Sequence, residues 1–162
     1  MTENKSELES LREENKRLAN RITELEDLVR TVSAPIIPSI IPGVLLIPLA
    51  GTVSSSKFDL IIPQLLEQAG GEDIDTAILD FTAISIKGLD DLKILGHYLI
   101  NLTSSLRLVG SQVLVVGITP RFAQELAKSQ LQFIKELQTF STFKSALQYL
   151  MKKKGLSLIK KV

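Results

Sequence analysis

The sequence has 162 residues, of which 44% are hydrophobic, and its 19 basic residues nearly balance its 18 acidic ones. That length favours one domain with an appendage, and a net charge of +1 gives no overall field that attracts nucleic acid or an acidic membrane. The chain has no cysteine, which excludes disulfides, thiol catalysis and thiolate metal sites and suits a reducing compartment. No signal peptide is visible, and no apolar run approaches the roughly 20 residues of a membrane helix. We therefore expect a cytoplasmic protein.

The first region, residues 1–33, has the pattern of a parallel coiled coil. Residues 3–32 contain no glycine or proline and are rich in Glu, Lys and Arg. Apolar residues recur at alternating spacings of three and four, which is the heptad repeat of helices that wrap around each other. The repeat places Leu8, Asn15, Ile22 and Val29 at position a, and Leu11, Leu18, Leu25 and Val32 at position d.

These positions favour a homodimer. β-Branched residues at a with leucine at d favour two parallel strands, and a single polar Asn15 at a fixes the register at some cost in stability. In such a dimer Glu7 faces Arg12 of the second helix, and Arg21 faces Glu26. The alternative is one amphipathic helix that lies on its own domain, but such a helix has no need of a regular heptad or a central asparagine. A DNA-binding zipper does not fit, because no basic region precedes the repeat.

A proline-rich segment follows the coiled coil. Residues 34–43 contain Pro35, Pro38 and Pro42, which end any helix and make a stiff, extended connection with a lead-in strand. We expect one domain over residues 44–154 and a basic tail over residues 155–162.

Strands and helices alternate through this domain. Continuous apolar runs predict buried strands, 3.6-residue periodicity predicts amphipathic helices, and the alternation indicates an α/β fold with a mainly parallel sheet of four to five strands covered by helices. The predicted strands are Val44–Leu49, Thr76–Phe81, Val113–Ile118 and a short edge strand, Glu136–Phe140. The predicted helices are Ser54–Gln68, Leu89–Val109, Pro120–Leu131 and Thr142–Lys154.

Residue patterns of catalysis are missing from this sequence. The single histidine, His97, lies within a predicted helix with no partner readable from the sequence, and we interpret it as a half-buried helix residue. Asp80, Asp90 and Asp91 could pair as acid and base, but the last two stand at a helix start, where acidic side chains interact favourably with the helix dipole. No glycine-rich phosphate loop is present. The lysines at 152–154 and 160–161 are interpreted as solvated, rather than as a nucleic-acid or lipid contact. We expect no catalysis, metal or cofactor.

Four segments of the sequence carry a family resemblance: GVLLIPLAGTVSSSKFD at Gly43–Asp59, AILDFTAI at Ala77–Ile84, LRLVGSQVLVVGITPRFAQEL at Leu106–Leu126 and FKSALQYL in the last helix. They resemble the STAS domain of the bacterial stressosome, of the RsbR/RsbS type, within the anti-sigma-factor antagonist superfamily. The resemblance covers about residues 36–152. It implies four or five strands with helices on one side, no cofactor and no catalysis by the domain. RsbR-type proteins also place a dimerising region and a helical linker ahead of the domain, as this chain places its coiled coil.

The resemblance also implies two switch positions, where phosphorylation controls capture and release of a serine/threonine kinase. The first follows the family pattern G-x-[IV]-D-[ST], which reads Gly51-Thr52-Val53-Ser54-Ser55 here, so that Ser55 takes the phosphorylated position and Ser54 replaces the acid. The other interpretation of Ser55 is a helix N-cap or a first-turn residue, since Ser54–Ser56 are all good candidates for starting that helix. The second is an Asp-Ser or Asp-Thr pair at the start of the long helix, for which Asp90 and Asp91 are the nearest equivalent. A carboxylate at the hydroxyl position would partly imitate a phosphate.

The function implied is that of a stressosome-type scaffold or antagonist that dimerises, assembles with related STAS proteins and binds a switch kinase. One alternative is a stand-alone anti-sigma-factor antagonist. The other is a small-ligand sensor.

Overall fold

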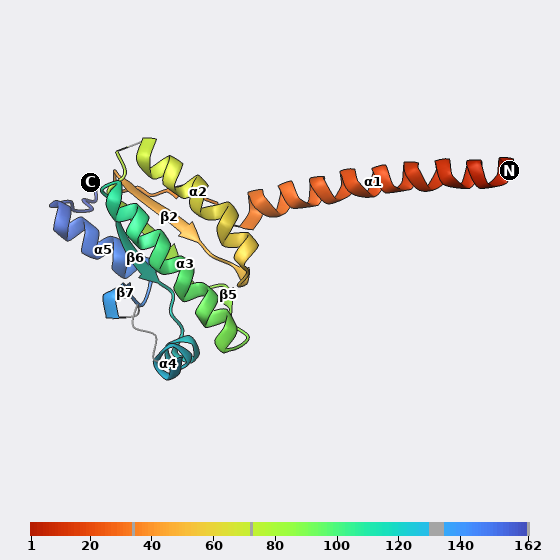
Figure 1. The fold of residues 1–162 in the computed structure, drawn as a ribbon. Helices are drawn as coiled ribbons and strands as arrows, with labels where there is room; N and C mark the ends of the chain where they lie inside the picture. The colour runs from red at the N-terminus through yellow and green to blue at the C-terminus, as the bar shows by residue number, and fades with distance from the viewer. Residues whose placement is uncertain (34, 72, 130–134, 162) are drawn as a thin grey trace. The chain divides into compact units, whose positions relative to one another are not determined.

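The computed structural model describes residues 1–33, 35–71, 73–129 and 135–161 of the chain, and it divides into two units, Met1–Val32 and Ser33–Val162. The first unit is a single helix, α1 (Thr2–Ser33), which follows from its uninterrupted run of good helix formers without glycine or proline. The second unit is an α/β domain (Figure 1).

The domain is built on a five-stranded sheet with the order β1-β2-β4-β6-β7. Four of its strands run parallel: β2 (Val44–Pro48), β4 (Thr76–Asp80), β6 (Gln112–Val116) and β7 (Gln138–Phe140). The first strand, β1 (Ile37–Pro38), pairs with β2 in the antiparallel direction. The α/β fold and the mainly parallel sheet predicted from the sequence are confirmed.

Apolar runs placed the three central strands correctly, and each strand has five residues where its run has six. Gly117 has a φ of +76°, which turns the chain out of the extended conformation and ends β6 before Ile118. Leu49 and Phe81 follow the ends of β2 and β4, where their backbone N–H groups still donate to Asp80 and Val116 carbonyls at 2.8 and 2.9 Å.

Helices cover both faces of the sheet, which corrects the one-sided arrangement that the resemblance implied. One face packs against α2 (Ser55–Gly71), α3 (Leu89–Leu108) and α4 (Pro120–Ser129) through buried side chains that include Leu65, Leu95 and Phe122. The opposite face packs against α5 (Phe143–Lys154), whose Ala146 and Leu150 are completely buried. Successive strand residues point to opposite faces, so fully apolar strands are what two covered faces require.

The helix bounds differ slightly from the predicted ones. Helix α2 continues through Gly70 to Gly71 instead of ending at Gln68. Helix α4 ends at Ser129, and the rest of its predicted range lies outside the described residues.

The proline-rich segment is part of the domain. Ile37 and Pro38 pair with Leu46 and Leu45 of β2, the Ser39 N–H donates to the Val44 carbonyl at 2.9 Å, and Ile41 is only 3% exposed. Prolines suit this edge position because the outer side of an edge strand needs no N–H donor.

Candidate functional site

The carboxyl ends of the parallel strands carry the two sequence-predicted switch positions at one edge of the domain. A second, two-stranded sheet joins β3 (Gly51–Thr52) and β5 (Ile84–Ser85) in parallel, and the Gly51 N–H donates to the Ala83 carbonyl at 3.0 Å. β3 precedes α2 and β5 precedes α3 (Figure 1). Because these two lead-in segments pair, the structure brings the start of α2 and the start of α3 to the same edge.

Helix α2 is capped by Ser54, which leaves Ser55 as the first helical residue. The Ser54 hydroxyl accepts a hydrogen bond from the Lys57 N–H at 3.3 Å, and the Ser54 carbonyl accepts one from the Phe58 N–H at 3.4 Å. A serine hydroxyl at this position satisfies an N–H that would otherwise lack a partner. Ser55 lies in the first turn and is exposed. Ser55 thus takes the first-turn position that the sequence analysis allowed, and Ser54 takes the N-cap position.

Lys57 is a basic side chain in the same turn, and it folds back over the preceding loop. Its ammonium group donates a hydrogen bond to the Ala50 carbonyl, and partial burial lowers the pKa of Lys57. This contact connects the start of α2 to the end of β2. It also places a positive charge beside the loop that carries the switch motif.

Tyr98 of α3 contacts the first two turns of α2, a feature that the sequence analysis missed. Its hydroxyl donates to Asp59 Oδ1 at 2.9 Å, and its ring stacks on Phe58 with the centroids 5.1 Å apart and the planes inclined by 15°. No sequence signal could have found this group of residues, because its members lie on two helices whose facing sides only the folded structure defines.

Asp90 and Asp91 occupy the first turn of α3, as expected. The N-cap residue is Gly88, which has no side chain to bond the helix amides. Asp91 Oδ2 accepts a hydrogen bond from the Lys87 N–H at 2.8 Å, and Asp90 is exposed. The Asp91 carboxylate thus reaches back to the segment before the helix, in the manner of the acidic residue of a capping box. Both carboxylates also interact favourably with the helix dipole.

A tight turn after β4 holds the loop that leads to β5. Asp80 Oδ1 accepts hydrogen bonds from the Thr82 N–H at 2.9 Å and from the Thr82 hydroxyl at 2.5 Å. Gly117 packs against this turn so closely that a Cβ atom there would lie 2.6 Å from Asp80 Oδ1. Asp80 is therefore engaged in turn formation, and Asp91 is engaged by the Lys87 N–H.

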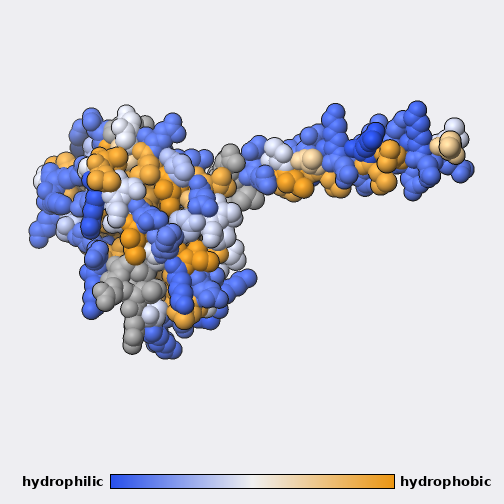
Figure 2. All heavy atoms as spheres, in the orientation of Figure 1, coloured by the Kyte–Doolittle hydropathy of each residue, from blue (hydrophilic) through white to orange (hydrophobic). Residues whose placement is uncertain are grey.

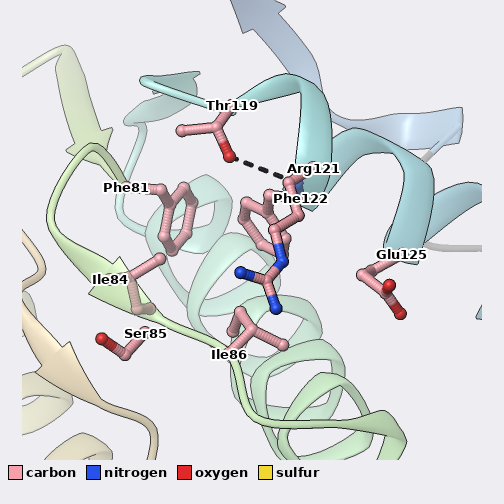
Figure 3. Close-up of a pocket in the computed structure, with 8 residues that line it drawn as sticks. All are labelled: Phe81, Ile84, Ser85, Ile86, Thr119, Arg121, Phe122 and Glu125. Carbon is pink, nitrogen blue, oxygen red and sulfur yellow. Dashed lines mark hydrogen bonds between the residues drawn. The ribbon is translucent and has the colours of Figure 1, made fainter.

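A cleft of about 230 Å³ opens beside this turn, between β5 and the first turn of α4. Phe81 and Phe122 meet edge to face in its wall, with centroids 6.0 Å apart, and Arg121 extends toward Ile86 on the opposite side (Figure 3). Drug-sized ligands occupy pockets of about 300–1,000 Å³. The volume of the cleft lies below this range.

In the part of the chain that the structure describes, His97 and the lysines at the end of α5 do not form a catalytic or metal-binding group. His97 is exposed rather than half-buried, with Nε2 3.4 Å from Asn101 Nδ2. Lys154 forms an ion pair with Asp75, and Lys153 donates to Gln112 Oε1 at 3.2 Å. Within the described residues, no group of three or more His, Cys, Asp or Glu could hold a metal ion. No described helix has the length and apolarity needed to cross a membrane.

Helix α1 displays the predicted dimerisation residues as an exposed apolar stripe (Figure 2). Leucine and isoleucine side chains along it are 44% to 56% exposed, and Asn15 is exposed among them. The side chains of Val29 and Val32 lie outside the described residues. Charged residues pair along the helix, with Arg21 Nη1 3.0 Å from Glu24 Oε2 and Arg17 Nη2 3.9 Å from Glu14 Oε1. The predicted stripe residues with described side chains are Leu8, Leu11, Asn15, Leu18, Ile22 and Leu25.

The mainly parallel sheet with helices on both faces is an α/β domain of the STAS type. The family model described as the STAS domain matches residues 35–146, and the chain belongs to this family. The chain is 27% identical over 108 residues to the RsbT co-antagonist protein RsbRD of Bacillus subtilis, a match that covers 67% of this chain and 37% of that protein. The curated relatives are longer, and the chain spans between 37% and 48% of their lengths.

Solved structures confirm the fold. RsbS of Moorella thermoacetica superposes with a TM-score of 0.60 at 18% identity, covering 76% of this chain and 98% of that one. A chain from the structure titled as the molecular architecture of the stressosome gives a TM-score of 0.56 at 18% identity, covering 74% and 98%. The STAS family that the sequence resemblance predicted is thus confirmed by the family model, and its fold by the solved structures.

Proposed function

We propose that this protein is a non-catalytic scaffold or antagonist of the stressosome type. It forms a homodimer through α1, assembles with RsbR- and RsbS-like STAS proteins in the cytoplasm and binds a partner-switching serine/threonine kinase in stress signalling. The observation that carries the proposal is the exposed stripe of α1, where leucines recur with heptad spacing around an exposed Asn15. Isolated helices are marginal in water and gain stability by burying such a stripe. A second copy of the same helix buries it with the register that Asn15 selects.

The switch-site geometry supports kinase control. Ser55 is exposed at the start of α2, beside helix amides and a dipole that accept negative charge. Phosphorylation there leaves α2 intact and acts on partner binding. At the start of α3 the carboxylates of Asp90 and Asp91 take the place of a hydroxyl, and a serine/threonine kinase cannot modify them. We propose that this second position is fixed in one state, with a single negative charge where a phosphate carries nearly two.

Phosphopeptide mapping tests the switch. After incubation with a cognate switch kinase and ATP, we expect phosphate on Ser55 and none at the start of α3. The Ser55→Ala variant is the control, and it should remain unmodified. Phosphate on Thr82 or Ser85 would contradict the proposed fixed position, because it would show that a working switch hydroxyl precedes α3.

Particle mass tests the assembly. The purified protein mixed with an RsbS-like STAS protein should form particles of megadalton scale in native mass or electron-microscopy measurements. If only a lone dimer forms with and without that partner, the protein acts as a stand-alone anti-sigma-factor antagonist instead. A small-ligand sensor has less support, because the sequence holds no glycine-rich phosphate loop.

A further inference from the structure

Three side chains from two helices meet beside the proposed phosphorylation site. Ser55 and Asp59 are four residues apart on α2, so they lie on the same side of the helix, one turn from each other. Tyr98 of α3 covers this side: its hydroxyl donates to Asp59 Oδ1 at 2.9 Å while its ring stacks on Phe58. The phenol therefore has a fixed ring position and a hydroxyl that lies near two residues of α2.

We propose that Tyr98 reads the phosphorylation state of Ser55: a phosphate on Ser55 replaces Asp59 as the acceptor of the Tyr98 hydroxyl and so transmits the state of α2 to α3. The inference rests on the proposed function in one respect, which is that Ser55 is the modified residue. It deepens that function by naming the side chain through which the modification acts.

The physical reason is a competition between two anions for one donor. A phosphoserine carries about −1.5 to −2 charges and three strong acceptor oxygens, against a single charge on a carboxylate. Both groups are ionised acceptors, and the phosphate takes the donor because it offers more negative charge and more acceptor oxygens. Like charges four residues apart on a helix also repel, which moves the Asp59 carboxylate away from its present position.

Asp59 and Ser55 both affect the pKa of Tyr98. The hydrogen bond to Asp59 raises the pKa of Tyr98 above its ordinary value, and the nearby Ser55 hydroxyl acts in the opposite direction. A phosphate at Ser55 removes that lowering effect and adds an acceptor and negative charge, both of which favour the protonated phenol. The pKa of Tyr98 thus rises further when Ser55 is phosphorylated.

The sequence makes this shift directly measurable, because the chain has two tyrosines and no tryptophan. In a Tyr149→Phe background, the ultraviolet absorbance of tyrosinate during a pH titration reports on Tyr98 alone. Phosphoserine is placed at position 55 by peptide ligation or during translation, without any kinase. Phosphoserine at position 56 is the matched control, since it adds the same charge to the same exposed turn, one residue further around the helix. His97, whose ring packs edge-on against Tyr98, is present in every variant.

Three results are expected together. Phosphoserine at 55 raises the pKa of Tyr98 more than phosphoserine at 56 does. Asp59→Asn lowers the pKa of Tyr98 in the unmodified protein. The same substitution has a much smaller effect once Ser55 is phosphorylated, because the hydroxyl has then changed its acceptor. The proposal is overturned if phosphoserine at 55 leaves the Tyr98 pKa unchanged, or if Asp59→Asn lowers it equally with and without the phosphate.

A second measurement covers the case in which Asp59→Asn fails to fold. Tyr98→Phe retains the ring that stacks on Phe58 and removes only the hydroxyl. Phosphoserine at 55 should change amide hydrogen exchange along α3 in the Tyr98 protein and leave it unchanged in the Tyr98→Phe protein. An equal change in both proteins would overturn the proposal. Because no kinase is used, these outcomes are independent of whether a switch kinase modifies Ser55.

Discussion

Gly117 has a backbone conformation that favours glycine, and it also lies against the turn that leads to β5. Its φ is +76°, and a Cβ atom there would lie 2.3 Å from Thr82 Oγ1 and 2.6 Å from the Thr82 N atom. Gly117→Ala therefore combines a left-handed backbone with a clash against the turn that leads to β5. We expect a loss of about 2–4 kcal/mol in the free energy of unfolding, measured by urea denaturation.

Gly110 provides the control that separates these two effects. Its φ is +87°, but no atom lies within 4 Å of the Cβ position. Gly110→Ala should cost only the conformational strain, about 1 kcal/mol. Equal losses for the two variants would show that the turn at Asp80 and Thr82 adjusts freely to the extra methyl group.

The residues of the candidate site differ in how far the sequence could predict them. Ser55 was found from the Gly51–Ser55 pattern, and Asp90 and Asp91 from their position before an amphipathic run. Local sequence patterns of this kind predict the first residues of helices well. Tyr98 was not found, because its bond to Asp59 joins residues 39 positions apart, and their meeting depends on how α2 and α3 pack.

Among the elements, apolar strands were the most predictable and two-residue strands the least. The apolar runs that begin at Val44, Thr76 and Val113 are too long for surface loops. The sequence therefore predicted both that these elements exist and that they are strands. β3 and β5 have two residues each, which is too short for any periodicity to appear. The position of α5 on the second face was also missed, since a helix pattern shows which side is buried and not which sheet face receives it.

The contact between α5 and the loop before β4 predicts a pH-dependent contribution to stability. Lys154 in the last turn of α5 pairs with Asp75 and donates to the Pro42 carbonyl at 2.9 Å. Burial raises the pKa of Asp75, but hydrogen bonds from Lys154 and Thr76 and the nearby lysine charges outweigh it, so the pKa lies below its ordinary value. A depressed carboxyl pKa stabilises the fold above the unfolded pKa and loses this effect as the pH falls through the folded one.

Lys154→Met should therefore lower the free energy of unfolding at neutral pH by less than about 1 kcal/mol, since the Asp75 side chain is 54% exposed. The difference from the unsubstituted protein should shrink as the pH falls below the 3.8 of free aspartate. Denaturant titrations across this range measure it, with the exposed Lys152→Met as the control. A difference that persists unchanged at the lowest pH would assign the effect to packing instead of charge.

The proline-rich segment determines where the domain can be cut. The domain unit begins at Ser33, so deletion of residues 1–32 should leave a protein with a cooperative unfolding transition. Deletion of residues 1–42 also removes β1 and Ile41, which is 3% exposed. We expect the longer deletion to lower the free energy of unfolding by at least about 1.5–3 kcal/mol, which is the contribution of one buried isoleucine. Calorimetry of both fragments would contradict this division if the shorter deletion abolished the transition.

At the scale of the whole molecule, the division into a bare helix and a packed domain predicts that α1 sets the oligomeric state. Its apolar stripe is exposed along a helix whose described side chains, residues 2–28, are all exposed, whereas the domain has apolar cores on both faces of its sheet. The proposed dimerisation therefore depends on the residues at positions a and d. Asn15 is the polar residue among them, and burying its amide in a dimer costs stability while it excludes other registers.

Asn15→Leu should raise the thermal stability of the oligomer and permit trimers or shifted registers, because leucine at an a position loses the preference for two strands. Sedimentation equilibrium measures the masses. Asn20→Leu is the matched control: it is the same change at an exposed position that the heptad places away from the helix interface, and it should leave a dimer. If Asn15→Leu remains a pure dimer of unchanged stability, Asn15 does not lie in the interface, and the assignment of Leu8 to position a fails with it.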